Sequence, residues 1–119
     1  MNVGDIVRVH TTLATPPKYK IALCVGVHFG NELFLWFNTE RRQRPAQMAV
    51  ERRKVPGISH DCFLDCGRVT TFPALELATA QYCGRASTDF LLKVADEIAL
   101  RATTLTTGQR NSIARVLGR

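Results

Sequence analysis

Two strand-like segments joined by a short turn constrain the fold of this chain more than any other feature. The segment Lys20–Phe29 is rich in apolar and β-branched residues, enough for burial on both faces of a sheet. Gly30-Asn31 follows, and both residue types accept positive φ angles. Glu32–Thr39 then has the composition of a returning strand. The sequence therefore predicts an antiparallel hairpin at the centre of a β-rich domain.

The turn also predicts the register of this hairpin. If Gly30-Asn31 is the two-residue loop, Phe29 pairs with Glu32, and Thr39 lies opposite Ala22. Lys20 is two residues beyond Ala22, so we expect it on the same face of the sheet as Thr39.

Further strands and helices are expected on either side of the hairpin. Alternation predicts a strand from about residue 3 to 10, and weaker signals predict strands at 48–50 and within 62–72. Pro73 starts a change in pattern, with a short helix expected to Ala80. Ser87 or Thr88 caps a helix to about Ala102, and Thr106 or Thr107 begins a last helix that ends at Gly118.

The apolar residues of these helices are expected to face the core. The stripe of the first long helix is Phe90, Leu91, Val94, Ile98 and Leu100, and that of the last is Ile113, Val116 and Leu117. Phe90 and Val94 are expected to close the open end of a small barrel. The fold class predicted is thus α+β and mainly β: one domain over 1–119, with a small antiparallel barrel or rolled sheet at about 3–72 and a helical part at about 73–118.

The chain shows no sign of secretion or membrane insertion. No apolar run approaches the ~20 residues that span a bilayer, and the first residues alternate instead of forming an apolar block. We therefore expect a cytoplasmic protein whose Cys24, Cys62, Cys66 and Cys83 are buried structural thiols, with no metal or cofactor. A zinc site is the alternative, built from Cys62 and Cys66 with His60 and either Cys83 or His28.

A basic connector, residues 39–54, follows the central hairpin. It carries six of the sixteen Lys and Arg residues in a chain of net charge +6: Arg41, Arg42, Arg44, Arg52, Arg53 and Lys54. Such a cluster beside a β scaffold favours a polyanionic partner, nucleic acid being the common case. A solvated loop that contacts nothing is the alternative.

The order of several short motifs resembles the MazF/PemK family of toxin endoribonucleases from bacterial toxin–antitoxin systems. Val3–Val9 (VGDIVRV) is similar to the family's first strand, and Lys20–Val25 (KIALCV) stands where the family has R-P-A-L-V. Phe34–Thr39 (FLWFNT) corresponds to a strand that ends in Thr-Ser. Asp61–Val69 (DCFLDCGRV) and Tyr82–Ser87 (YCGRAS) are similar to the later stretch that precedes a helix.

The resemblance implies an SH3-like barrel with C-terminal helices, shared with the CcdB-type toxins, and usually a homodimer. It also implies binding of single-stranded RNA, metal-independent cleavage to a cyclic phosphate, and neutralisation by a small acidic antitoxin protein. The family's catalytic Arg and Thr correspond to Lys20 and Thr39. Ile21 replaces the Pro, Glu40 replaces the Ser, and the helix from Thr106 extends beyond the usual end of the family.

These departures leave the chemistry open. A lysine is a point charge without the planar fork of arginine, although a desolvated lysine can act as a base. His60, next to Asp61, is the fallback catalytic residue. Trp36 either packs in the core or stacks on a base. The alternative function is a module on the same fold that binds nucleic acid or protein and has lost catalysis.

Overall fold

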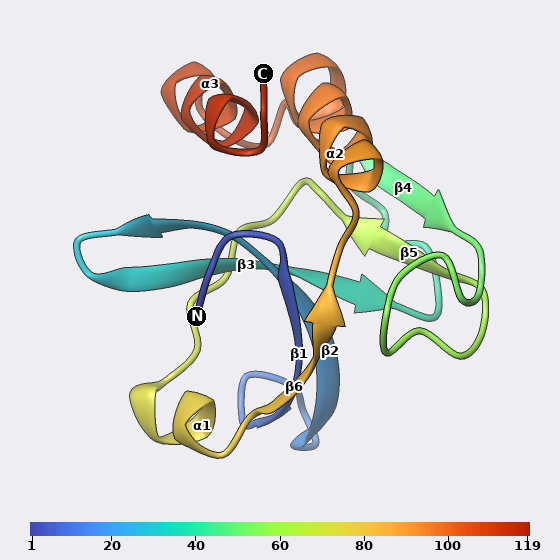
Figure 1. Ribbon diagram of the computed structural model, residues 1–119, viewed down its shortest axis with the longest axis vertical. Coiled ribbons are helices and arrows are strands. Elements are labelled where there is room, and N and C mark those ends of the chain that lie inside the picture. The colour runs from blue at the N-terminus through green and yellow to red at the C-terminus, as the bar shows by residue number, and fades with distance from the viewer.

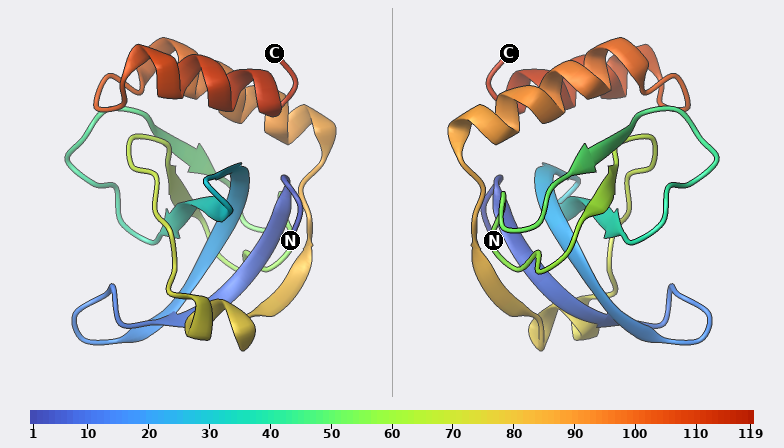
Figure 2. Two further views of the ribbon diagram at one scale, coloured as in Figure 1. Left: turned by 90° about the vertical axis from the view of Figure 1, so that its left-hand side faces the viewer. Right: turned by 90° about the vertical axis from the view of Figure 1, so that its right-hand side faces the viewer.

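A six-stranded antiparallel sheet forms the body of the computed structural model, which describes residues 1–119 (Figure 1). The strands, in chain order, are β1 (Asp5–Thr11), β2 (Lys18–His28), β3 (Asn31–Asn38), β4 (Gln47–Val50), β5 (Cys62–Asp65) and β6 (Gln81–Arg85). Across the sheet they run β4-β5-β3-β2-β1-β6, and the outer strands β4 and β6 do not pair with each other. The protein is therefore α+β and mainly β, with a sheet that is bent but not closed (Figure 2).

Three helices accompany the sheet, namely α1 (Ala74–Ala78), α2 (Thr88–Arg101) and α3 (Thr107–Val116). The predicted starts of the two longer ones are confirmed. The Ser87 hydroxyl accepts a hydrogen bond of 3.1 Å from the Phe90 amide, and Thr106 forms a reciprocal capping box with Gln109. The two helices lie side by side over one end of the sheet (Figure 2). None of the three is long and apolar enough to cross a membrane.

Alternation along the strands builds two apolar layers, one on each face of the sheet. The larger core joins the sheet to α2 and α3, and its sheet members include Ile6, Leu23, Val25, Leu35 and Leu64. The smaller core lies on the opposite face and consists of Val7, Val9, Ala22, Cys24, Phe34 and Phe72, with Trp36 packed against it. The central strands β2 and β3 are thus buried on both faces, as their composition predicts.

The predicted hairpin exists, but its predicted register is wrong. The loop consists of Phe29 and Gly30, with φ angles of 49° and 78°, so that His28 pairs with Asn31. Positive φ at both loop residues is the pattern of a type I′ turn, in which Gly30 takes the second place. An irregularity between Cys24 and Gly26 then shifts the pairing by one further residue.

The consequence appears at the far end of the hairpin. Ala22 pairs with Trp36 and Ile21 with Phe37, so continuing the ladder sets Lys20 opposite Asn38. Successive residues of a strand point to opposite faces, and Thr39 therefore leaves the face that carries the Lys20 side chain.

Other differences concern the second half of the chain. The sequence pattern does not predict β6, which follows α1 and pairs with β1, so the sheet continues past residue 72. Within 62–72 only β5 is a strand, joined by an isolated bridge between Phe34 and Thr70. Val94 is buried and Phe90 packs against the same core, as expected. Leu100 and Val116 are instead 70% and 51% exposed.

Candidate nucleic-acid interface

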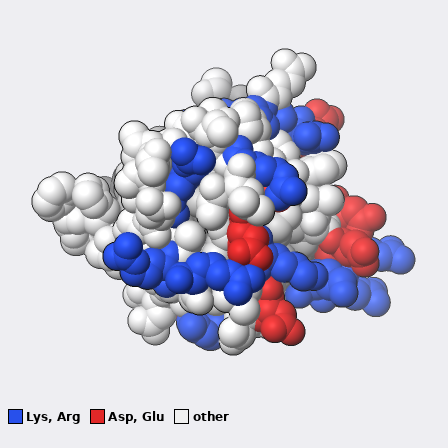
Figure 3. Space-filling model, turned by 90° about the horizontal axis from the view of Figure 1, so that it is seen from above, with Lys and Arg blue, Asp and Glu red and all other residues white.

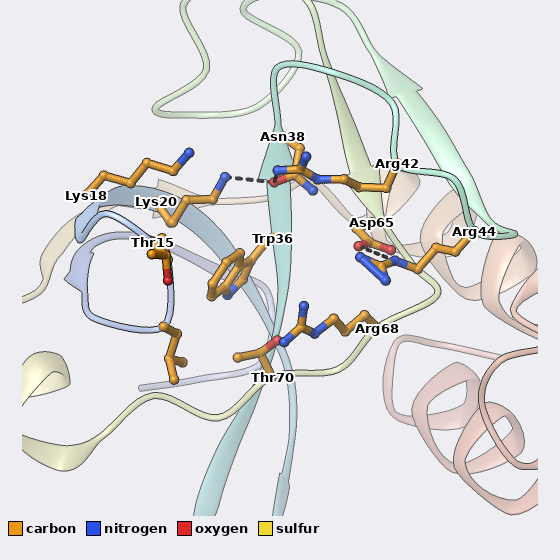
Figure 4. Close-up of a pocket in the computed structure, with 12 residues that line it drawn as sticks. Thr15, Lys18, Lys20, Trp36, Asn38, Arg42, Arg44, Asp65, Arg68 and Thr70 are labelled. Atoms are coloured by element: carbon orange, nitrogen blue, oxygen red, sulfur yellow. Dashed lines mark hydrogen bonds and ion pairs between the residues drawn. The ribbon is translucent and has the colours of Figure 1, made fainter.

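A pocket of about 400 Å³ opens between the β1–β2 loop, the ends of β2 and β3, and the basic connector (Figure 4). We call it the cationic pocket, because five of its twelve lining residues are basic, namely Lys18, Lys20, Arg42, Arg44 and Arg68. Asp65 is the one carboxylate in its wall. This excess of positive charge makes the pocket a candidate binding site for an anion.

Lys20 provides the buried amine of the pocket. The residue is 8% exposed, and its Nζ donates a hydrogen bond of 2.7 Å to Oδ1 of Asn38. No carboxylate lies within ion-pair distance of it. Burial, followed by repulsion from Lys18 and Arg42, lowers the pKa of Lys20 from 10.5 to about 8. A part of the Lys20 amines is therefore neutral near physiological pH.

Arg44 and Asp65 attach the connector to the sheet. The Arg44 Nε lies 3.0 Å from Oδ2 of Asp65, a residue that is only 3% exposed. Oδ1 of the same carboxylate accepts hydrogen bonds from the Gln47 side chain at 2.7 Å and from the Gly67 amide at 3.2 Å. The negative charge of Asp65 is thus neutralised by an ion pair within the protein. The other cations of the pocket have no carboxylate partner.

Trp36 forms part of the pocket floor. Its ring stacks against Phe72, with centroids 5.9 Å apart and planes 11° from parallel. Lys20 Nζ and Arg68 Cζ lie 5.3 and 5.9 Å from the centroid of the Trp36 ring. These contacts favour the packing role, because the ring is engaged by the core and by two cations.

Thr39 and His60 meet at a neighbouring pocket of about 230 Å³. Thr39 Oγ1 lies 3.4 Å from Nε2 of His60. Lys20 also lines this second pocket, but its amine is bonded to Asn38. The expectation that Lys20 and Thr39 lie on one face of the sheet is therefore wrong, for the reason of register given above.

The six cations of the connector are not one surface. Arg42 and Arg44 enter the cationic pocket, and Arg41 lines a shallow surface beside them. Arg52, Arg53 and Lys54 are exposed in the β4–β5 loop, outside the pocket. Positive charge is also found elsewhere. Figure 3, seen from the side of the helices, shows Lys and Arg side chains spread over the surface with acidic groups among them.

Among the charged and amide side chains of the pocket, four were not expected from the sequence, namely Lys18, Asn38, Asp65 and Arg68. Two of them could have been found from strand alternation. Lys18 lies on the same face of β2 as Lys20, and Asn38 lies on the same face of β3 as Trp36. Asp65 and Arg68 had no such signal, because the pairing of β5 with β3 and β4 places Asp65, and the segment after β5 carries Arg68 to the pocket.

The cysteines are separate from this site. Cys24, Cys62 and Cys66 are buried, as predicted, whereas Cys83 is half-buried. Burial raises the pKa of all four thiols, that of Cys62 to about 11. No group of three or more His, Cys, Asp or Glu side chains is placed to hold a metal ion, so the zinc alternative is not assembled.

Comparison with known proteins found no protein similar to this chain. No protein-family model matches the chain, and neither the curated proteins nor the solved structures include a match.

Proposed function

We propose that the protein is a MazF/PemK-like endoribonuclease that holds single-stranded RNA at the cationic pocket. The observation that carries the proposal is Lys20, a buried amine among cations with no carboxylate partner. Burying an unpaired charge is costly, and such a group is stabilised when an anion arrives. A phosphate of the RNA backbone supplies that anion, with Lys18, Arg42 and Arg68 around it.

The lowered pKa gives Lys20 a chemical role. In the fraction of the protein in which Lys20 is neutral, Lys18, Arg42 and Arg68 hold the phosphate. The Lys20 Nζ then accepts the proton of a ribose 2′-hydroxyl, and the 2′-oxygen attacks the adjacent phosphorus. The bond from phosphorus to the 5′-oxygen breaks, and that oxygen takes a proton from water. The products are a 2′,3′-cyclic phosphate and a 5′-hydroxyl. Arg42 and Arg68 stabilise the charge that develops on the phosphoryl oxygens.

The resemblance extends the proposal to architecture and partners. A bent antiparallel sheet with C-terminal helices is compatible with an SH3-like barrel, although β4 and β6 are not paired. A homodimer and a small acidic antitoxin are proposed on the resemblance alone, and a cytoplasmic location is proposed with them. An acidic partner also fits the charge of the cationic pocket.

Cleavage of varied single-stranded RNAs, with mapping of the new ends, tests the proposal. We expect wild-type cleavage in the presence of a chelator, at a rate that rises with pH and levels off above about pH 8. Lys20→Ala loses about a hundredfold or more in rate. Lys20→Arg loses a similar factor while retaining RNA affinity, because a guanidinium keeps its charge but does not release a proton. Lys93→Ala, an exposed lysine on α2, is the matched control and keeps the wild-type rate.

Full activity in Lys20→Arg would contradict the role of Lys20 as a base. Full activity in Lys20→Ala would move the chemistry to Thr39 and His60, which contact each other at 3.4 Å.

A binding module without catalysis is the second candidate. It is favoured by the hydrogen bonds of these two residues, since the Lys20 amine is bonded to Asn38 and the Thr39 hydroxyl contacts His60. Wild-type protein that binds RNA through the cationic pocket, yet cleaves none of the RNAs tested, would support this candidate.

A further inference from the structure

We infer that Asn38 is a positioning residue that joins Lys20 and Arg42 into one seat for a single phosphate group, an inference that rests on the proposed RNA-binding function. Asn38 is the last residue of β3 and is 2% exposed. Its side chain lies at the point where the β2 strand and the basic connector meet (Figure 4).

One oxygen atom connects the two cations. Oδ1 of Asn38 accepts a hydrogen bond of 2.7 Å from Lys20 Nζ and a longer one of 3.4 Å from Arg42 Nη2. A carbonyl oxygen has two lone pairs, so it can accept from both donors at once. Asn38 therefore links Lys20, a residue of β2, to Arg42, a connector residue that lies outside any strand.

Lys20 and Arg42 have N–H donors that Asn38 does not use and that a ligand can bind. A lysine ammonium has three N–H donors and an arginine guanidinium has five. After one bond each to Asn38, Lys20 retains two donors and Arg42 retains four. Both side chains line the same pocket, so their remaining donors suit the oxygens of one phosphate group.

The neutrality of Asn38 is the decisive property. A carboxylate at this position would bind the same two cations and cancel part of their charge. The pocket also contains a carboxylate that binds a cation, since Asp65 forms an ion pair with Arg44 at 3.0 Å. Asp65 therefore anchors its arginine as part of the structure, whereas Asn38 orients two cations and leaves their charge available to an anion.

The charged groups that line the pocket with Lys20 support this distinction. Lys18, Arg42 and Arg68 are basic, and the single carboxylate of the pocket, Asp65, is engaged with Arg44. The pKa of Lys20 is lowered in part by Lys18 and Arg42. A phosphate between these side chains relieves their repulsion.

The test replaces Asn38 with its charged isostere. Asn38→Asp keeps an oxygen acceptor in place, so a purely structural role for Asn38 predicts unchanged ligand affinity. The positioning role predicts at least a tenfold loss of affinity for inorganic phosphate and for a short single-stranded RNA. It also predicts that the added carboxylate raises the pKa of Lys20, observed by NMR titration of the lysine side chain. The matched control is Asn31→Asp, the same change at the exposed start of β3, and we expect affinities within twofold of wild type.

Asn38→Ala provides the second variant, in case Asn38→Asp folds poorly. It removes the acceptor without adding charge, so we expect a loss of several-fold in affinity without a rise in the pKa of Lys20. Wild-type affinity in both variants, or a pKa of Lys20 unchanged in Asn38→Asp, would overturn the inference while leaving the proposed function intact. A wild-type protein that binds neither phosphate nor RNA would overturn both. Binding of phosphate but not RNA, lost in Asn38→Asp, would support the seat and contradict the proposed RNA ligand.

Discussion

The amine of Lys20 and the amide oxygen of Asn38 lie 2.7 Å apart across the β2–β3 ladder, and both residues are buried. The pair unites a charge that is costly to bury with an acceptor that does not neutralise it. The cationic pocket is thus a place where the fold tolerates an unfavourable group. Four predictions concern this pocket, the connector beside it and the cysteines, and three of them need no knowledge of the ligand.

The first prediction concerns stability. Lys20→Met retains the volume of the side chain and removes its charge, so it should raise the free energy of unfolding by about 1 kcal/mol at pH 7. The gain is expected because desolvation of the Lys20 amine and its repulsion by Lys18 and Arg42 disappear. Urea unfolding of both proteins, followed by circular dichroism, measures the difference. A clear destabilisation would mean that the bond to Asn38 outweighs the cost of burial.

The same pair of proteins should differ in pH dependence. The pKa of Lys20 is about 8 in the folded protein and near 10.5 in the unfolded chain, so the unfolded chain binds more protons between these values. The contribution of Lys20 to stability therefore rises with pH from about 8 to 10.5. Subtracting the unfolding free energies of Lys20→Met from those of wild type at each pH should isolate this rise. A flat difference would contradict the lowered pKa.

The second prediction separates the cationic pocket from the basic loop between β4 and β5. Arg42→Ala with Arg68→Ala should weaken binding of single-stranded RNA and reduce the slope of log affinity against log salt by about 0.7 per lost phosphate contact. The control is Arg52→Ala with Arg53→Ala, which removes the same charge from an exposed loop outside the pocket. Its slope should stay at the wild-type value. Equal effects in both double variants would indicate a diffuse basic surface instead of a defined pocket.

The third prediction concerns the anchor of the connector. Asp65→Ala removes the acceptor of Arg44, Gln47 and the Gly67 amide, and should cost about 1–3 kcal/mol of stability. Limited proteolysis at Arg41–Arg44 should also become faster, because the connector loses its tie to β5. Asp61→Ala is a milder change for comparison, since this exposed carboxylate accepts one hydrogen bond, from the Arg52 amide. Equal stability of Asp65→Ala and wild type would contradict the anchoring role.

The fourth prediction concerns the cysteines. Cys83 is the only one of the four that is not fully buried, so it should react first with a thiol reagent in the native protein. Cys24, Cys62 and Cys66 should react only on unfolding, because burial protects them and raises the pKa of each thiol. Mass spectrometry of peptides after a short alkylation pulse distinguishes the sites. Early labelling of Cys62 would show that the β5 region opens in solution.

The part of the fold that could be predicted depends on interactions between near neighbours in the chain. Ser87 and Thr106 identify their helices because each cap bonds an amide three residues away. The hairpin was predictable as an element, because its apolar strands and glycine-containing turn are adjacent. Its register was not, because the loop is Phe29-Gly30 instead of Gly30-Asn31, and an irregularity between Cys24 and Gly26 shifts the pairing by one further residue without a pattern in the sequence.

The sequence by itself determined the alternating strands, the two capped helices and a concentration of basic residues after β3. Only the tertiary structure decided which of these basic residues converge. It turned the Lys20 amine toward Asn38 and the Thr39 hydroxyl toward His60, and it brought Arg68 to a pocket that begins at the β1–β2 loop. The physical reason is that the face on which a side chain lies depends on strand pairing over the whole sheet. A shift of one residue exchanges the two faces, and no local preference of the chain determines that shift.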